Sequence, residues 1–255
     1  MTKSQYINQS VQRAIRIMHL FSPKENELSL TEISRKTGIH KSIVFRILAT
    51  LESEGWLIKN PETSKYMLGV RLLSLSGVVL EELSIRKIAL PVMEELSEKT
   101  GETVVLTMSS NGGAICIEKI DSDSSVRITT QVGRHYPLHA GATGLAVLMG
   151  MPDDQIREVL NREPLEKITN KTITDPELIF EMVKEAKKDG YIISVGTVDP
   201  GVVAIGIPLN FPQQHVYFGI SVTGPKYRLN EKKLQFVIEE LKNAKQKILQ
   251  TGIND

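Results

Sequence analysis

The sequence is short of the residues on which several classes of protein depend. Its 255 residues include a single cysteine, Cys116, which excludes an internal disulfide framework and a cysteine-rich zinc site. No apolar run approaches the roughly 20 residues that span a bilayer, and the amino-terminal MTKSQYINQS lacks the apolar core of a signal peptide. We therefore expect a cytoplasmic protein in which Cys116 is a small buried side chain of a strand.

Net charge is almost absent too. The formal charge is +1, so overall charge indicates no nucleic-acid partner. The distribution is uneven, because residues 1–70 hold ten Lys or Arg against six Asp or Glu, whereas the remainder holds 21 against 24. A basic head on a slightly acidic body fits a DNA reader joined to a separate sensor. The length favours two domains.

Motifs of common enzymes are missing as well. The sequence contains no Gly-x-Ser-x-Gly, phosphate-binding loop or paired-histidine motif. A small-molecule enzyme, the alternative function, would depend on His135 and His139 with Asp121 or Asp123, but no carboxylate or cysteine lies at metal-ligand spacing from these histidines. We expect no catalytic residue, no metal site and no cofactor. A third alternative, an interaction module that does not bind DNA, would leave the basic helix described next without a role.

Residues 29–57, SLTEISRKTGIHKSIVFRILATLESEGWL, predict two helices joined by a tight turn. Their apolar positions recur at helical spacing: Leu30, Ile33, Thr37, Ile43, Leu48 and Leu51. Gly38 can take the left-handed conformation that ends a helix, and His40 or Lys41 then begins the next. This is the helix-turn-helix pattern, and an ordinary helical hairpin with a solvated charged face is the alternative.

The second of these helices carries residue types suited to a DNA groove. Its start holds Lys41, Ser42, Phe45 and Arg46. Such side chains can reach phosphates and base edges. The following WLIKNPETSKYMLG predicts a hairpin placed like the wing of a winged helix, with Lys59 and Lys65 flanking its tip. Arg13, on a helix expected from Gln9 to Phe21 and capped by Ser10, could also reach phosphate.

The next segment predicts a linker. Residues 71–87 read as a helix that is interrupted at Gly77, and the helical pattern bends or restarts around Pro91. This helix is more apolar than one globular face requires, so a second copy of itself is the natural partner. We therefore expect a winged helix-turn-helix domain at 1–70, a linker helix at 71–87 and a sensor domain at 88–255.

The sensor domain shows period-two patterns separated by helices. Strands are expected at 103–110, 114–120, 126–132, 191–195, 202–210 and 216–224, and helices after residue 141, at 153–161, at 176–189 and at 230–249. Thr174 and Asp175 supply the start signal of the helix at 176–189. The last two strands are antiparallel if Phe211 to Gln214 form the turn. The fold class is therefore α+β with a mainly antiparallel sheet.

These segments together resemble the IclR family of bacterial transcriptional regulators. The motifs INQSVQRAIRIMHLF, SLTEISRKTGIHKSIVFRILATLESEGWL, PETSKYMLG, GETVVLT, PLHAGATG, TITDPE and SVTGPKYRL occur in the family's order and spacing over nearly the whole chain. The resemblance implies a winged helix that binds double-stranded DNA at a near-palindromic operator, and a GAF-like domain that binds a small organic effector. It implies a regulator, expected to be a repressor, that acts as a homodimer or homotetramer without membrane attachment.

The resemblance also implies an effector site. Carried over by motif, this site comprises Gly141, Ala142, Thr143, Ser194, Ala204, Ser221 and Thr223. Ser221 and Thr223 alternate along one strand and so face the same side, and backbone N–H groups at a helix start favour an anion. The alternative is that these small residues only serve sheet packing.

The sequence departs from the family pattern at positions that decide the ligand. Ser194 stands where relatives often have aspartate, Ala204 where they have cysteine, and Leu145 where they have lysine. The acidic run before the next glycine is reduced to Asp199. We therefore expect a less polar pocket, in which hydroxyls and backbone N–H groups rather than a cationic side chain hold a carboxylate or aromatic acid.

Overall fold

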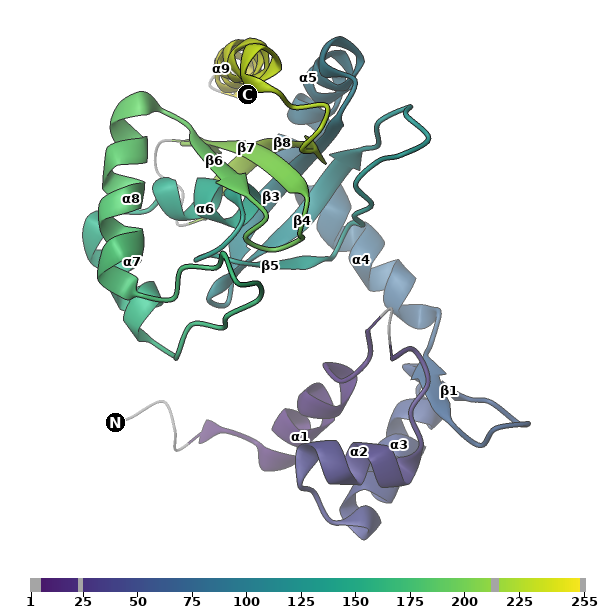
Figure 1. Cartoon of the computed structure of the whole chain (residues 1–255). Helices are drawn as coiled ribbons and strands as arrows, with labels where there is room; N and C mark the ends of the chain where they lie inside the picture. The colour runs from purple at the N-terminus through teal and green to yellow at the C-terminus, as the bar shows by residue number, and fades with distance from the viewer. Residues whose placement is uncertain (1–5, 23–24, 212–215, 253–255) are drawn as a thin grey trace. The chain divides into compact units, whose positions relative to one another are not determined.

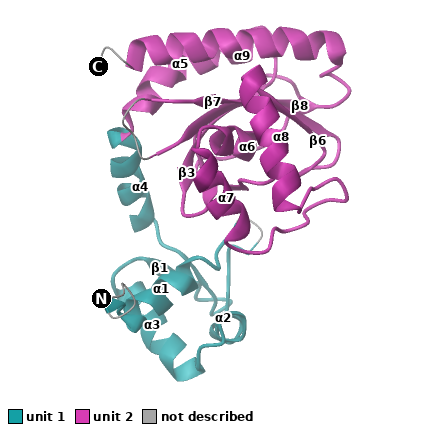
Figure 2. Cartoon of the chain, turned by 90° about the vertical axis from the view of Figure 1, so that its left-hand side faces the viewer, with its two compact units in different colours: residues 1–82 teal, residues 83–255 magenta. Residues whose placement is uncertain are grey.

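The computed structural model describes residues 6–22, 25–211 and 216–252. The chain divides into two compact units, residues 1–82 and 83–255 (Figure 2). Each unit has its own hydrophobic core.

Unit 1 consists of helices followed by a short hairpin and a further helix (Figure 1). The elements are α1 (Gln9–Met18), α2 (Leu30–Thr37), α3 (Lys41–Ser53), β1 (Leu57–Lys59), β2 (Tyr66–Leu68) and α4 (Arg71–Glu82). Ile17, Ile33 and Leu48 place one fully buried side chain from each of the first three helices in a common core. The predicted helix-turn-helix and its hairpin are both confirmed.

Local signals determine where the helices of unit 1 begin and end. The Asn8 side chain, and not Ser10 as predicted, accepts hydrogen bonds from the first turn of α1. Ser29 and Glu32 form a reciprocal capping box at α2. Gly38 ends α2 with φ +70°, and His40 caps α3, so the tight turn has the chemistry expected of it.

The segment after the hairpin differs from the prediction. Helix α4 contains Gly77 without interruption, and α5 (Ser84–Thr100) continues through Pro91. The break falls instead at Leu83, whose φ of −80° and ψ of 85° are not helical. Pro91 lies in the second turn of α5, where its missing N–H costs at most one hydrogen bond.

Unit 2 is built on one antiparallel sheet. Among the described residues it contains β3 (Thr103–Ser110), β4 (Gly113–Ile120), β5 (His135–Pro137), β6 (Ile192–Val195), β7 (Val202–Leu209) and β8 (Phe218–Pro225), in the order β5-β4-β3-β8-β7-β6. The helices are α5, α6 (Ala142–Met149), α7 (Asp153–Asn161), α8 (Pro176–Asp189) and α9 (Glu231–Gly252). The expected α+β class with an antiparallel sheet is confirmed.

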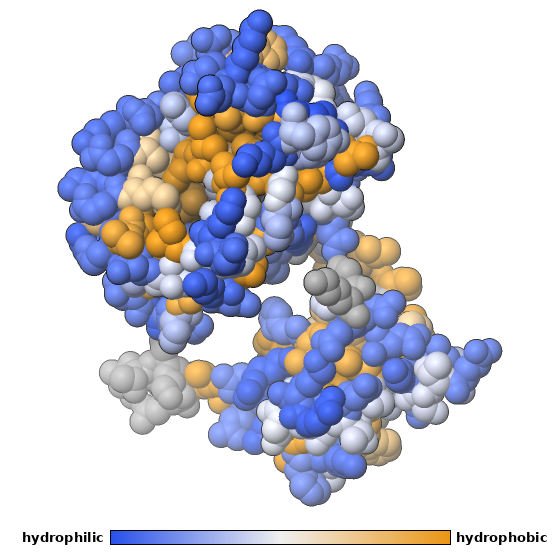
Figure 3. Space-filling model, viewed as in Figure 1, coloured by the Kyte–Doolittle hydropathy of each residue, from blue (hydrophilic) through white to orange (hydrophobic). Residues whose placement is uncertain are grey.

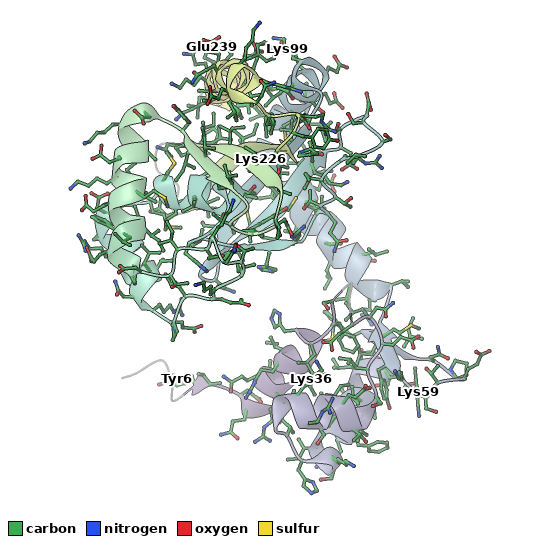
Figure 4. The ribbon with its side chains drawn as sticks, in the orientation of Figure 1. Tyr6, Lys36, Lys59, Lys99, Lys226 and Glu239 are labelled. Carbon is green, nitrogen blue, oxygen red and sulfur yellow. The ribbon has the colours of Figure 1, made fainter. Side chains whose placement is uncertain are left out.

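The helices cover the two faces of the sheet (Figure 1). Helices α5 and α9 pack on one face around Met93, Leu241 and Ile248, and α6 with α7 and α8 covers the other. Lys99 on α5, labelled in Figure 4, forms an ion pair with Glu240 on α9 at 2.8 Å, which joins these two helices. On the face seen in Figure 3, hydrophobic residues also show near β6 and β7, where Ile193 and Val195 are half-buried.

One predicted strand is wrong. Residues 126–132 form a loop, and the edge of β4 is paired instead by the short strand β5. The N–H of Cys116 donates to the carbonyl of Arg134, and the N–H of Gly133 donates to the carbonyl of Cys116. Residues 133–137 therefore already occupy the edge that the predicted strand would need. The turn expected at Phe211 to Gln214 lies, apart from Phe211, outside the described residues.

Candidate functional site

The first candidate site is the outer surface of α3. Val44 and Leu48 are fully buried, whereas Lys41, Phe45 and Arg46 are exposed. Phe45 leaves 57% of its surface exposed although it is a large hydrophobic residue. An exposed aromatic beside cations is unfavourable for a purely solvated face and suits contact with bases and phosphates.

The hydroxyl of Ser42 has a partner within the protein. Its Oγ lies 2.8 Å from Nδ1 of His40, the residue that caps α3. Ser42 is exposed and stands at the same end of the helix as Lys41. His40 was not among the predicted contact residues, but its position at the exposed start of α3 places it there too.

The remaining predicted cations of unit 1 differ in position. Lys59 is exposed on β1, with Nζ 5.8 Å from the ring centre of Tyr66 (Figure 4). Lys65 is half-buried just before β2. Arg13 and Arg46 both line a groove between α1 and α3. The described part of unit 1 thus presents cations from α1, α3 and the hairpin.

The second candidate site is a small cavity in unit 2. It lies at the amino-terminal end of α6, between the β6–β7 connection and the segment before β5. Its walls include five of the seven predicted effector residues: Gly141, Thr143, Ser194, Ala204 and Thr223. These residues come from α6, β6, β7 and β8, so the tertiary fold brings them together.

The other two predicted residues lie behind the wall. Ala142 is fully buried, and its N–H donates to Ser194 Oγ at 2.8 Å. Ser221 is 1% exposed, and its Oγ lies 3.0 Å from Thr143 Oγ1. They hold two wall residues in place instead of facing the space themselves.

The cavity also has walls that the sequence analysis missed. They include Ile128, Thr130, Arg134, Tyr136, Thr197, Val198 and Val202, and they stand beside Asp199, which the sequence analysis had noted without assigning it to the site. Arg134 brings a cationic side chain to the cavity, so the expectation of a pocket without one is wrong. The nearest signal was the position of Arg134 just before PLHAGATG, but its direction depends on the unpredicted strand β5.

Arg134 is held by several groups. Its Nη1 donates to the carbonyl of Thr129 at 3.3 Å, and its guanidinium carbon lies 5.2 Å from the ring centre of Tyr136. Its Nη2 lies 3.7 Å from Oδ2 of Asp199. Tyr136 bonds the hydroxyl of Thr130, and burial raises the pKa of this tyrosine, so the phenol stays neutral and presents a polar edge to the cavity.

The histidines of the alternative hypothesis do not form a catalytic group. His135 is exposed on β5, and His139 is buried with Nε2 2.9 Å from the carbonyl of Glu166.

Burial raises the pKa of the Cys116 thiol to about 12, so this thiol is no nucleophile at neutral pH. Across the described residues, no three His, Cys, Asp or Glu side chains gather as metal ligands, and no helix is long and apolar enough to cross a membrane.

Comparisons with known families cover both units. The family described as "Bacterial transcriptional regulator IclR C-terminal" matches residues 77–250, and "IclR helix-turn-helix domain" matches residues 10–61. The HTH-type transcriptional regulator KipR of Bacillus subtilis (strain 168) is 35% identical over 237 residues, which is 93% of this chain and 94% of that protein. The two family matches, at residues 10–61 and 77–250, together span nearly the whole chain.

Solved structures of IclR-type proteins share the fold of this chain. An IclR transcriptional regulator from Alicyclobacillus acidocaldarius is 28% identical, with a TM-score of 0.83 over 96% of this chain and 99% of that one. An IclR homologue from Microbacterium hydrocarbonoxydans complexed with 4-hydroxybenzoate shares the fold at 24% identity, with a TM-score of 0.77 over 95% and 98% of the two chains. The enzyme hypothesis built on His135 and His139 is therefore wrong. The chain belongs to the IclR family of bacterial transcriptional regulators.

Proposed function

We propose that this regulator is a repressor that binds a near-palindromic operator and changes its operator affinity when a small organic acid occupies the cavity beside α6. The observation that carries the proposal is the cavity itself, which assembles wall residues from one helix and three strands that are distant in sequence. Repression requires the protein to occupy promoter DNA, so the proposal includes a cytoplasmic location together with that DNA.

The proposed division of labour follows the predicted domains. Residues 1–70 would bind DNA, residues 71–87 would form the linker and residues 88–255 would bind the effector. The non-helical residue Leu83 lies inside this linker. A break between α4 and α5 gives a point at which the linker can change direction.

Within the DNA-binding domain, we assign the contacts to Arg13, Lys41, Ser42, Phe45, Arg46, Lys59 and Lys65. The exposed face of α3 supports entry into a major groove, because Val44 and Leu48 anchor the opposite face. The hairpin supports a flanking contact through Lys59, which is exposed on β1. Backbone contacts of this kind position the helix, and base-edge contacts specify the sequence.

Within the effector domain, the site comprises the predicted Gly141, Ala142, Thr143, Ser194, Ala204, Ser221 and Thr223. Thr143, Ser194 and Thr223 bring hydroxyl-bearing side chains to the cavity wall, and Ala204 brings an apolar one. The hydroxyls of Ser194 and Thr143 already bond the N–H of Ala142 and the hydroxyl of Ser221. Mixed polar and apolar walls suit a small molecule with one polar end.

DNA binding can be tested by selection. The full-length protein should enrich a near-palindromic sequence from a pool of random duplexes. Arg46→Ala should then bind that duplex about 5- to 100-fold more weakly in gel-shift titrations, because loss of a base or phosphate contact costs roughly 1–3 kcal/mol. The measurement is made at two salt concentrations, since loss of a phosphate contact also flattens the salt dependence.

A matched control removes a cation elsewhere. Lys226→Ala deletes an exposed lysine of unit 2 (Figure 4) and should leave the affinity unchanged. Equal affinity of Arg46→Ala and the natural protein, or no enriched sequence at all, would overturn the assignment.

Ligand binding can be tested at Thr223. Thr223→Val removes one wall hydroxyl while keeping the side-chain volume, and should weaken binding of a responsive acid such as 4-hydroxybenzoate by about tenfold, the effect of one hydrogen bond of about 1.4 kcal/mol. Ser221 is the poorer target, because a larger side chain there would break its bond to Thr143. Calorimetry measures the affinity.

The control for this variant is Thr100→Val, which makes the same change at a buried threonine of α5 that bonds the carbonyl of Leu96. Unchanged ligand affinity in Thr223→Val would exclude the cavity as the effector site.

A further inference from the structure

The polar groups of the cavity that can hold an anion are already occupied. The N–H of Gly141 donates to Thr197 Oγ1 at 3.1 Å, and the N–H of Ala142 donates to Ser194 Oγ at 2.8 Å. The guanidinium of Arg134 faces the carboxylate of Asp199 at 3.7 Å. All three acceptors come from one segment, residues 194–199, at the end of β6 and in the connection to β7.

This segment is seated on the start of α6. The side chain of Val198 lies so near Gly141 that a β-carbon there would come within 2.9 Å of it. Glycines at both ends of the connection, Gly196 with φ +69° and Gly201 with φ +80°, take left-handed conformations. Such residues can absorb a change in backbone direction. The Thr172 hydroxyl bonds the carbonyl of Thr197 at 2.6 Å, whereas the exposed Asp199 lies farther along the connection.

The cavity is too small for a ligand while the segment is in place. Its volume is about 40 Å³, whereas a cavity of about 150 Å³ is what a benzene ring fills in a protein interior. An acid with a ring-sized body would therefore either displace part of the wall or extend out of the cavity. The pair of Arg134 with Asp199 is a weak wall contact, because their side chains are 35% and 52% exposed and exposed ion pairs stabilise little.

Arg134 has contacts besides Asp199. The Thr129 carbonyl accepts a hydrogen bond from its Nη1 at 3.3 Å, and the Tyr136 ring centre lies 5.2 Å from its guanidinium carbon. Loss of the Asp199 carboxylate would thus leave a positioned cation at the cavity wall, beside the apolar side chains of Ile128 and Val202. One such cation matches one carboxylate, which it can bind through paired N–H groups.

We propose that Asp199 is a built-in counter-ion that occupies the place of the ligand's carboxylate on Arg134, and that the effector is a monocarboxylate with a small apolar body that displaces it. The proposal rests on the proposed function, because it concerns the same cavity. Arg134 then selects for the charged end of the ligand, and Asp199 sets the affinity by competing for the same guanidinium.

The test compares carboxylates with their neutral amides. Acetate, pyruvate and benzoate, with acetamide, pyruvamide and benzamide, are titrated into the full-length protein by calorimetry. At least one acid should bind, and its amide should bind at least tenfold more weakly. Asp199→Asn should bind that acid at least fivefold more tightly, because the competing charge is gone while the side chain keeps its size. The amide's affinity should not change.

The arginine is tested in the opposite direction. Arg134→Gln should weaken binding of the acid at least tenfold, and Arg134→Lys should recover part of the loss, because it restores the charge without the paired donors. Asp123→Asn and Arg127→Gln make the same chemical changes at exposed positions of the loop before β5 that do not line the cavity, and should bind like the natural protein. Thermal unfolding checks that each variant is folded.

Two results would overturn the proposal. One is an Asp199→Asn variant whose affinity for the acid is equal to or weaker than that of the natural protein. The other is the absence of carboxylate binding in both proteins at millimolar concentration. The first result leaves operator selection and the Thr223→Val test untouched, so it overturns the role of Asp199 alone. The second result would also contradict the organic acid of the proposed function, and operator selection would then still test DNA binding separately.

Discussion

At the scale of single residues, two glycines decide how closely α6 approaches the sheet. A β-carbon at Gly206 would lie 2.3 Å from the carbonyl oxygen of Ala142, and one at Gly219 would lie 2.9 Å from the β-carbon of Ala146. Both glycines sit on central strands, where glycine has no intrinsic advantage. The close approach of α6 accounts for glycine at both positions, and it sets the position of the start of α6, which forms one wall of the cavity.

We expect Gly206→Ala to lower the free energy of unfolding by about 1–3 kcal/mol or more, because the added methyl meets backbone and not a movable side chain. Urea denaturation measures the change. Gly133→Ala is the control for backbone strain alone, since Gly133 has φ +87° with open space around it and should cost about 1 kcal/mol. A Gly206→Ala variant as stable as the natural protein would contradict the close contact.

At the scale of elements, α9 contains a lysine, Lys245, whose partial burial disfavours its charged form. Lys245 is half-buried against unit 2, and burial lowers its pKa from the ordinary value of 10.5. Neighbouring cations of α9 are better placed, since Lys247 bonds Glu95 at 2.5 Å. Because the folded pKa lies below the unfolded one, the charged form disfavours folding below the folded pKa, and the penalty disappears as the pH rises past 10.5.

We expect Lys245→Met to raise the free energy of unfolding at pH 7 by about 0.5–1 kcal/mol, since it keeps the apolar stem and removes the buried charge. The gain should shrink when the comparison is repeated near pH 10. Denaturant melts of both proteins at the two pH values provide the measurement. Lys242→Met, at an exposed position of the same helix, is the control and should show no such dependence. A gain that grows with pH would mean that the burial of Lys245 has another effect.

At the scale of the whole molecule, α4 is left with an apolar surface. No residue of α4, all of which is described, is buried. Leu73, Val78 and Val79 are 71%, 61% and 57% exposed, and α4 shows hydrophobic colour in Figure 3. One unit cannot hide this surface by itself, so a second copy is the proposed partner, which also supplies the second half of a near-palindromic site.

We therefore predict a dimer or tetramer at micromolar concentration, measured by light scattering. The double variant Leu73→Lys, Val79→Lys should shift the mass toward the monomer and weaken operator binding more than tenfold, because a single winged helix contacts half a site. Leu178→Lys, at an exposed leucine of α8, should change neither property. A natural protein that is a stable monomer would refute the prediction.

Much of this architecture could be read from local patterns. The helices at 153–161 and 176–189 have the predicted bounds. For the second helix the reason is plain, because Asp175 and Gly190 are strong start and stop signals that act over one turn. The helix-turn-helix was equally readable from Gly38 and the helical spacing. The prediction of a strand at 126–132 was wrong. Alternation of apolar and polar residues reflects the surroundings of the side chains, and it does not determine which segment pairs with a free sheet edge.

The candidate effector site, too, could be predicted only in part from the sequence. Sequence motifs identified Gly141, Thr143, Ser194 and Thr223 as wall residues, but Arg134 and Asp199 were missed as a pair. They are 65 positions apart in the chain, and their meeting depends on β5 and on the β6–β7 connection. No local pattern carries that information.

By itself, the sequence determined the elements whose signals are local: the caps, the turns, the apolar faces of the helices and the alternation of most strands. These depend on interactions within a few residues, which the order of the chain specifies directly. Only the tertiary structure decided which groups line the cavity, that Ala142 and Ser221 lie behind its wall, and that Arg134 and Asp199 meet there. Those outcomes depend on long-range packing, where burial and charge pairing between distant segments determine the direction of each side chain.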